Sequence, residues 1–340
     1  MEIYFLEYKV RHGDTLSSIA ARLNITVEEL KLFHNSHCQR INRIWFENLN
    51  EVKMVFVPLQ VQTEKQKDQK KKNTLPSSQL SNSFFAKTYN VTETFENPFE
   101  SVLTIDYTVD IHLRKDKSTN HHIISYNQNH FRTHGETPED KISGLSISCM
   151  KSIMPIDFTL NDSGKIIGFT DHGKITKDFA EQRKDLDFFA GEISERYMDK
   201  FEKNIADEKF FLHQLQSTLL FQVLFPKLEW FHKKTEWTES FYFLQNSFSV
   251  PCHMEIEQEN EDQDHITTTL TGSYTEFYSL QELRTGTKYN EPVDDPVSGN
   301  IIIEYTTHKK NRNLVQASAT ISLWREEEVI QKHTLTITQG

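Results

Sequence analysis

Glycine and cysteine are scarce in this sequence, and long apolar runs are absent. The chain has 11 glycines among 340 residues and contains no GxGxxG, GxxxxGK[ST] or GxSxG motif, so no phosphate-cradling loop or nucleophile elbow is expected. The cysteines, Cys38, Cys149 and Cys252, are odd in number and far apart. This spacing predicts neither a disulfide framework nor a CxxC metal site. Because no run of about 18 apolar residues occurs, we expect no transmembrane segment.

The sequence also lacks a side-chain constellation that indicates catalysis. His130 and His134, in HFRTH, have the i, i+4 spacing of a helical metal-binding pair. The Glu of HExxH is missing, however, and the neighbouring stretch that includes His121 and His122 is polar. We therefore expect a solvated loop there rather than a zinc site. The sequence predicts no catalytic residue, no metal and no cofactor, and we expect the protein not to be an enzyme.

Charge is distributed unevenly along the chain. Residues 61–83 contain five lysines and two acidic residues, whereas residues 84–340 contain 40 acidic and 26 basic residues. Nucleic-acid binding needs Lys and Arg clustered on a folded face, so we expect no nucleic-acid partner. The N-terminus, MEIYFLEYKVRHGD, lacks the basic, apolar and small-residue order of a signal peptide. We expect a cytoplasmic protein, or one that reaches the cell envelope by delivery or assembly.

Composition predicts a folded chain with more than one domain. At 340 residues and 36% hydrophobic composition, the chain is long enough for two or three domains. Residues 61–83, VQTEKQKDQKKKNTLPSSQLSNS, have almost no apolar side chains to bury, which is typical of a solvated, flexible linker. This predicts a small module at 1–60, a Lys-rich linker at 61–83 and a larger domain at 84–340.

The small module has a regular order of elements. Residues 8–12 alternate as a strand does, and Gly13 supplies a turn before Asp14 and Thr15, which are suited to cap a helix. Apolar residues then recur at helical spacing from residue 16 to 23 and again from 27 to 33, with Thr26 as a second cap. KMVFVP, at 53–58, predicts a second strand that ends at a proline.

YKVRHGDTLSSIAARLNITVEELKLFHN, followed by VFVP, resembles a LysM domain over residues 7–58. The resemblance rests on a Tyr-x-Val strand, the Gly-Asp-Thr-Leu turn, a Thr-x-x-Glu-Leu second helix, Asn35 and the closing strand. It implies a βααβ fold that binds GlcNAc-containing glycans of peptidoglycan or chitin. It also implies a groove with Gly13, Asp14, Thr15 and Leu16 on one wall and Asn35 and the residues after it on the other.

The loop that follows Asn35 departs from the family's pattern. SHCQRINRIWFENLNEVK, at 36–53, is long and lacks the usual Pro-Gly-Gln turn. Its apolar residues Ile44, Trp45 and Phe46 either stack on sugar rings or are buried under an extra turn of helix. We take Ile44 and Trp45 as candidate glycan-binding residues beside those of the turn.

The larger domain combines strands and helices. Alternation over 99–115 predicts a strand with one polar face, and residues 144–171 contain two strands joined by a turn at 161–164. Helical periodicity over 175–225 predicts two consecutive helices, the second of them capped by Asp207. Polar turns then separate five segments that we expect to be the strands of an antiparallel meander, at 247–257, 265–277, 299–310, 313–325 and 329–339.

These elements predict an α+β fold, in which a curved antiparallel sheet is covered by a helix pair. The layout is similar in outline to lipoprotein-carrier-like folds, although no motif supports that likeness.

Three functions remain open from the sequence. The first is a non-catalytic binding protein that recognises peptidoglycan or another GlcNAc glycan, or that acts as an adaptor in an envelope-associated assembly. The second is a cytoplasmic structural or adaptor subunit of a phage-tail-like or contractile secretion apparatus, with other protein subunits as partners. The third is a carrier of an apolar ligand, which requires a large apolar cavity under the helices of the C-terminal domain.

Overall fold

The computed structural model describes residues 5–23, 25–46, 49, 52–58, 73–98, 100–116, 121–189, 191–260, 262–288 and 295–340. The chain divides into two compact units, an N-terminal unit of residues 1–73 and a C-terminal unit of residues 74–340. Most of the linker predicted at 61–83 lies outside the described residues. At its end, Leu75 and Leu80 are buried, and the Leu80 N–H donates to the carbonyl oxygen of Asp162 at 2.7 Å. The C-terminal unit thus begins before residue 84.

The N-terminal unit is a βααβ fold, as the sequence predicts. Strands β1 (Phe5–Lys9) and β2 (Met54–Pro58) pair antiparallel, and helices α1 (Leu16–Leu23) and α2 (Val27–His37) lie between them in the chain. A short 3₁₀ helix, η1 (Arg40–Asn42), follows α2. The apolar stripes of both helices are buried with the inward residues of β2 in one core; its buried residues include Leu16, Ile19, Leu30, Ile44, Val55 and Val57.

A capping box begins α2. The hydroxyl of Thr26 accepts a hydrogen bond from the Glu29 N–H at 3.1 Å, and the Glu29 carboxylate accepts one from the Thr26 N–H at 2.9 Å. Two amide groups that the helix itself leaves without partners are therefore satisfied, which fixes where α2 starts.

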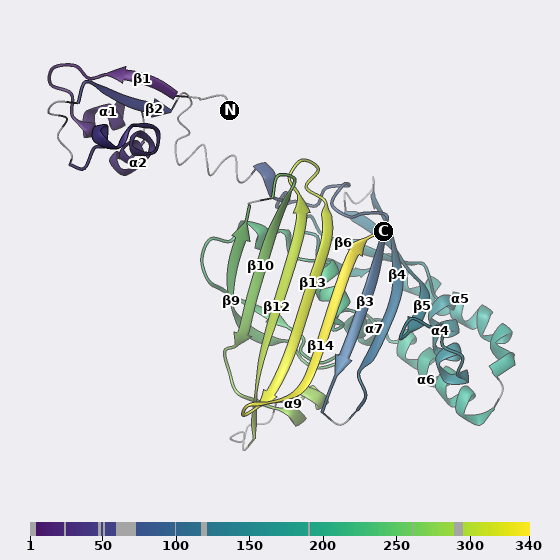
Figure 1. The fold of residues 1–340 in the computed structure, drawn as a ribbon. Helices are drawn as coiled ribbons and strands as arrows, with labels where there is room; N and C mark the ends of the chain where they lie inside the picture. The colour runs from purple at the N-terminus through teal and green to yellow at the C-terminus, as the bar shows by residue number, and fades with distance from the viewer. Residues whose placement is uncertain are drawn as a thin grey trace. The chain divides into compact units, whose positions relative to one another are not determined.

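The C-terminal unit is built on one antiparallel sheet (Figure 1). Within the described residues the sheet has 12 strands, in the order β7-β6-β5-β4-β3-β14-β13-β12-β10-β9-β8, with β11 paired to β12. The strands are β3 (Thr88–Glu96), β4 (Leu103–Lys115), β5 (His122–Thr133), β6 (Ile156–Leu160), β7 (Ile166–Phe169), β8 (Trp237–Phe241), β9 (Val250–Glu259), β10 (His265–Tyr274), β11 (Tyr278–Ser279), β12 (Pro296–His308), β13 (Leu314–Arg325) and β14 (Glu328–Gln339). The α+β class and the curved antiparallel sheet predicted from the sequence are confirmed.

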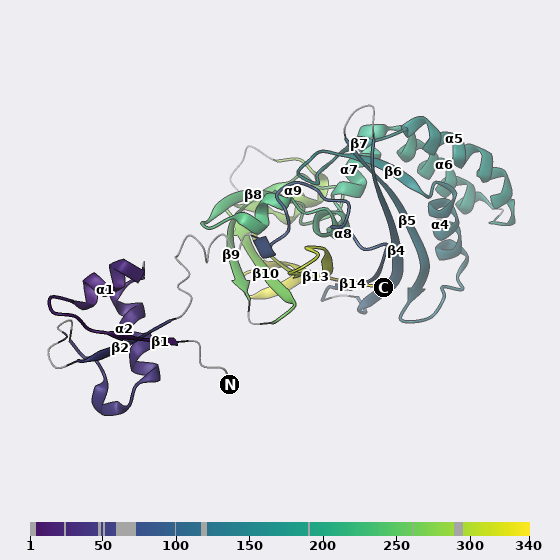
Figure 2. The ribbon, with the colours of Figure 1, turned by 90° about the horizontal axis from the view of Figure 1, so that it is seen from above.

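Helices cover one face of this sheet. They are α4 (Lys141–Ser152), α5 (His172–Gln182), α6 (Glu192–Ala206), α7 (Glu208–Gln216), α8 (Leu219–Leu224) and α9 (Leu280–Thr285), together with the 3₁₀ helices η2 (Arg183–Phe189) and η3 (Leu228–His232). Figure 2 shows α7 and α8 inside the curve of the sheet. No helix in the described part of the chain is both long enough and apolar enough to cross a membrane.

The sequence predicted two helices over residues 175–225, and this number is wrong because the structure has more than two helices there. Separate caps divide this stretch, because Asp171 caps α5, Asp207 caps α7 and Thr218 caps α8 through side-chain oxygens. Each cap satisfies the free amide groups of a new first turn, and so several shorter helices form instead of two.

The hairpin expected within 144–171 is present as β6 and β7, but residues 144–152 are not a strand. They belong to α4, whose start is fixed by the Asp140 carboxylate, which accepts a hydrogen bond from the Ser143 N–H at 2.8 Å. Leu145, Cys149 and Ser152 are the buried residues of this helix, and their spacing is helical. Alternating serines and apolar residues in the sequence resemble a strand and conceal this period.

The polar stretch around the histidines is also not the loop that we expected. His122 begins β5 and is buried, and Ile124 and Tyr126 follow it on the inward face of the strand. His130 lies near the end of β5 with a φ of 56°. Many residues of β5 are Asn, Gln or His, which gives the segment a polar composition although every second residue in its first half is buried.

Candidate functional sites

Two loops of the N-terminal unit emerge at the same end of its sheet. Lys9, the last residue of β1, pairs with Met54, the first residue of β2. One residue beyond this pair, the Val10 N–H donates to the carbonyl oxygen of Lys53 at 3.0 Å. The start of the turn at 11–15 and the end of the loop that leads into β2 are therefore neighbours, as a groove between the turn and this loop requires.

Asp14 holds the turn at 11–15 together. Its carboxylate accepts hydrogen bonds from the Arg11 N–H at 2.8 Å and from the Tyr8 hydroxyl at 3.1 Å, and it forms an ion pair with Arg22 at 2.8 Å. The hydrogen bond from Arg11 is the main cause that lowers the pKa of Asp14. With its side chain only 3% exposed, Asp14 stabilises the turn and offers little surface to a ligand.

The other predicted residues of this wall have structural surroundings as well. Gly13 has a φ of 89°, a conformation that favours glycine. Thr15 begins α1, because its hydroxyl accepts from the Ser18 N–H at 3.0 Å while the Ser18 hydroxyl accepts from the Thr15 N–H at 2.9 Å. Leu16 is fully buried. Gly13 and Thr15 are exposed and remain accessible to a ligand, and Leu16 supports them from the core.

The second wall is fixed by Asn35. Its side-chain amide donates to the carbonyl oxygen of Ile44 at 3.0 Å and accepts from the Ile44 N–H at 2.8 Å, so it acts as a clamp on the loop. Ile44 is 3% exposed, whereas Trp45 is 64% and Phe46 79% exposed. Ile44 is therefore buried, while Trp45 and Phe46 present their rings to solvent.

His34 is a supporting residue that the sequence did not reveal. It is buried, its Nδ1 accepts from the Phe56 N–H at 3.0 Å, and its Nε2 donates to the carbonyl oxygen of Asn42 at 2.9 Å. The two bonds require a neutral ring with its proton on Nε2. The ring thus ties β2 to η1, at the base of the loop that carries Trp45.

The turn, the two helices and the closing strand together point to one family. A model of the LysM domain matches residues 8–33. The N-terminal unit contains a LysM domain. The matched residues include the turn at 11–15 and the start of α2, and they end before the loop that carries Trp45 and Phe46.

Other comparisons add little to this family match. No curated protein matches the chain. Among solved structures, the LolA superfamily protein NE2245 from Nitrosomonas europaea is similar at 8% sequence identity and a TM-score of 0.18, over 79% of this chain and 88% of that one. At so low a TM-score we draw nothing from the likeness.

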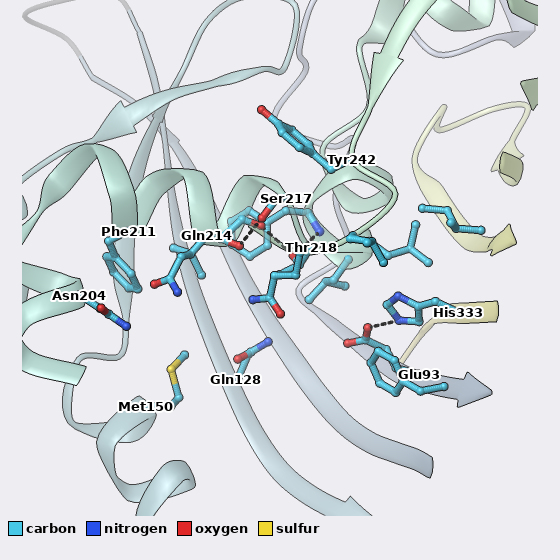
Figure 3. Close-up of a pocket in the computed structure, with 18 of the residues that line it drawn as sticks. Glu93, Gln128, Met150, Asn204, Phe211, Gln214, Ser217, Thr218, Tyr242 and His333 are labelled. Atoms are coloured by element: carbon cyan, nitrogen blue, oxygen red, sulfur yellow. Dashed lines mark hydrogen bonds and ion pairs between the residues drawn. The ribbon is translucent and has the colours of Figure 1, made fainter. Parts of the chain in front are cut away.

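The C-terminal unit contains a cavity of about 590 Å³ between the sheet and the helices (Figure 3). Strands β3, β4, β5, β13 and β14 contribute residues to it, as do α4, α6, α7 and α8. Its lining is mixed rather than apolar. The polar residues are Glu93, Gln128, Asn204, Gln214, Ser217, Thr218, Gln245, Gln331 and His333, and the others include Phe95, Tyr107, Met150, Phe201, Phe211, Leu215, Leu219 and Ile321.

An acidic side chain lies at one end of this cavity. Glu93 Oε2 is 2.7 Å from His333 Nε2, and Glu93 Oε1 accepts a hydrogen bond from the Tyr107 hydroxyl. The side chains of Glu93 and His333 are 14% and 15% exposed. Burial, and next the charge of Glu93, raise the pKa of Tyr107 well above its ordinary value, so Tyr107 keeps its proton and donates it to this bond.

One group of side chains could hold a metal ion. Among the described residues, Glu236, His253 and Glu255 place their ligand atoms within 4.8 Å of one another. All three are exposed, and His253 Nε2 already lies 3.2 Å from a carboxylate oxygen of Glu236. The contact between His253 and Glu236 accounts for two of the three side chains, and exposed acidic groups are common without a metal ion.

Proposed function

We propose that the LysM domain binds a GlcNAc-containing glycan such as peptidoglycan, through the turn at 11–15 and the loop that carries Trp45 and Phe46. The family match supports glycan binding, and the adjacency of the two loops supports the position of the groove. Gly13 and Thr15 lie on the exposed turn, which can offer hydrogen bonds to acetamido and hydroxyl groups.

Exposure of Trp45 and Phe46 is the observation that carries the proposal furthest. Large apolar rings in water are costly unless another molecule covers them, and aromatic rings offer flat faces for the C–H surface of a sugar. The clamp by Asn35 and a hydrogen bond from Lys31 Nζ to the carbonyl oxygen of Trp45 at 2.5 Å hold the backbone that presents these rings. Less ordering is then needed when a glycan binds.

The test is cosedimentation of the full chain with purified peptidoglycan, alongside titration with soluble GlcNAc oligomers. We expect the unaltered protein to be retained and Trp45→Ala together with Phe46→Ala to abolish retention. Leu6→Ala is the matched control, because Leu6 is also exposed but pairs with Val57 toward the opposite end of the two-stranded sheet from both loops. If the unaltered protein is not retained, or if Leu6→Ala weakens retention as much as the double variant does, glycan binding at this groove is wrong.

The role of an adaptor in a phage-tail-like or secretion assembly, the cellular location and the lack of enzymatic activity stay predictions.

A further inference from the structure

The two ends of the cavity in the C-terminal unit differ in their chemistry, and this difference limits the kinds of molecule that the cavity can bind. Its volume of about 590 Å³ lies within the range of small-molecule sites. In Figure 3, the Glu93–His333 pair lies at one end, and Met150, Asn204 and Phe211 lie at the other. The walls between them include amide side chains from both layers, with Gln128 on β5 and Gln214 on α7.

The Glu93 end of the cavity contains a carboxyl side chain, and the described lining contributes no Lys or Arg to balance it. Among the described residues that line the cavity there is no Lys or Arg, and Glu93 and His333 are the ionisable groups apart from tyrosines. The Glu93 carboxylate accepts one hydrogen bond on each oxygen, and each oxygen has capacity for a further donor. A carboxylate or phosphate head group placed here would meet the carboxyl group of Glu93 with no Lys or Arg in the described lining to pair with it, whereas a head group that donates hydrogen bonds would meet acceptor oxygens.

The remaining walls suit a molecule with both apolar and hydrogen-bonding parts. Phe201, Leu215 and Ile321 offer apolar surface, and the amide side chains offer donors and acceptors in the same space. A ligand with no hydrogen-bonding group at all would leave Glu93 and the amides near it without partners when it displaced water from them.

We propose that the cavity binds an amphipathic small molecule whose head group donates hydrogen bonds and carries no negative charge, with that head group at Glu93. The apolar part of the ligand lies toward α6 and α7. This inference concerns the C-terminal unit and is independent of glycan binding by the LysM domain.

Three ligands that share one alkyl chain but differ in head group test this inference on the full protein. They are 1-decanoylglycerol, decylamine and decanoate, titrated by calorimetry below their aggregation concentrations. At pH 8 decanoate is ionised and decylamine is protonated. We expect the glycerol ester and the amine to bind at least about tenfold more tightly than decanoate, a difference of about 1.4 kcal/mol.

Two substitutions assign the selectivity to Glu93. Glu93→Gln keeps the shape of the side chain and removes its charge, so we expect it to reduce the discrimination against decanoate to about twofold or less. Glu96→Gln is the matched control on the same strand. Three residues along β3, Glu96 points to the opposite face and pairs with Lys332, so the selectivity should not change.

A third variant tests the location of the ligand. Gln214→Trp places a large ring in the cavity from α7 and should weaken binding of the glycerol ester about tenfold or more, while circular dichroism verifies the fold. The proposal is overturned if decanoate binds as tightly as the other two ligands, if Glu93→Gln and Glu96→Gln behave alike, if none of the three ligands binds, or if a folded Gln214→Trp variant binds as before.

Discussion

A partly buried ion pair joins the start of η3 to the edge strand β8 of the C-terminal unit, and its loss has a predictable cost. Lys227 Nζ lies 2.8 Å from Glu239 Oε1, and Trp230 Nε1 donates to Glu239 Oε2 at 2.9 Å. The Glu239 side chain is 12% exposed. Burial by itself raises the pKa of Glu239, but the hydrogen bonds from Lys227 and Trp230 outweigh it and lower the pKa below its ordinary value.

Replacing Lys227 by Met keeps the length of the apolar stem and removes the charge. Glu239 is then left as a covered carboxylate with Trp230 as its remaining side-chain donor. Removing one partner of a fully buried pair costs about 3–5 kcal/mol, and since Lys227 is itself a third exposed, we expect a loss of about 2 kcal/mol.

Urea unfolding at pH 7.5, followed by tryptophan fluorescence, measures this loss, and Trp230 is a probe at the site itself. With a urea dependence of about 3 kcal/mol per molar, the midpoint should fall by about 0.7 M. Lys233→Met is the matched control. Lys233 is as exposed as Lys227, but its partner Glu229 is 3.9 Å away and 57% exposed, and its Nζ lies 5.9 Å from the centre of the Trp237 ring, so its loss should cost at most about 1 kcal/mol.

At acid pH, the difference in unfolding free energy between Lys227→Met and the unaltered protein should be smaller. The lowered pKa of Glu239 contributes stability that is present above the ordinary value of 4.5 and is lost as the pH falls through the folded-state value. In the variant, protonation of the covered carboxyl relieves the unpaired charge. A deficit that is the same at pH 4 and pH 7.5, or a Lys227→Met variant as stable as Lys233→Met, would refute the reasoning.

Three further predictions concern stability and reactivity. A Cβ at Gly299 would lie 2.6 Å from Cζ of Tyr274, so Gly299→Ala should destabilise the C-terminal unit by about 1–3 kcal/mol in thermal melts, whereas Gly168→Ala, with nothing within 4 Å of the added carbon, should be nearly neutral. The hydrogen bond from Arg11 is the main cause of the lowered pKa of Asp14, so the stabilising effect of this carboxylate is complete above pH 3.8 and is lost as the pH falls through the lowered value. Asp14→Asn should remove this acid dependence from the unfolding of the LysM domain, as followed by NMR. Burial raises the pKa of Cys149 to about 11 and that of Cys252 to about 12, so a thiol reagent at pH 8 should label Cys38 in the native protein and all three cysteines in urea.

Local signals in the sequence predicted the elements that local chemistry decides. The capping box of Thr26 and Glu29 involves residues three apart, and its two hydrogen bonds form as the motif implies. Strands β9, β10, β12, β13 and β14 of the meander were predicted in the same way, since polar turn residues bound them, whereas β8, β11 and α9 were not predicted. Where a competing local signal was stronger, the prediction failed, as in α4, whose alternating serines resemble a strand.

The candidate sites depend on contacts that no local pattern contains. Glu93 and His333 are 240 positions apart and meet because β3 and β14 are neighbours in the sheet. In the LysM domain, the resemblance to the family implied Asp14 and Leu16 as parts of the groove, but the Asp14 carboxylate interacts with a backbone amide, a tyrosine and an arginine and stabilises the turn. Exposure of Trp45 beside a buried Ile44 follows from the clamp by Asn35, which becomes visible only in three dimensions.

The place of β14 in the sheet has a consequence for how the protein is made. Strand β14 lies between β3 and β13, and it joins the β3–β7 part of the sheet to the β8–β13 part (Figure 1). During translation, both parts leave the ribosome before β14 does. The two halves therefore expose unpaired edges at β3 and β13 to other nascent chains until β14 is inserted, whereas the LysM domain closes on residues that are close in sequence. The interval between the synthesis of β13 and the pairing of β14 is therefore the one in which these two edges are open to pairing with another strand.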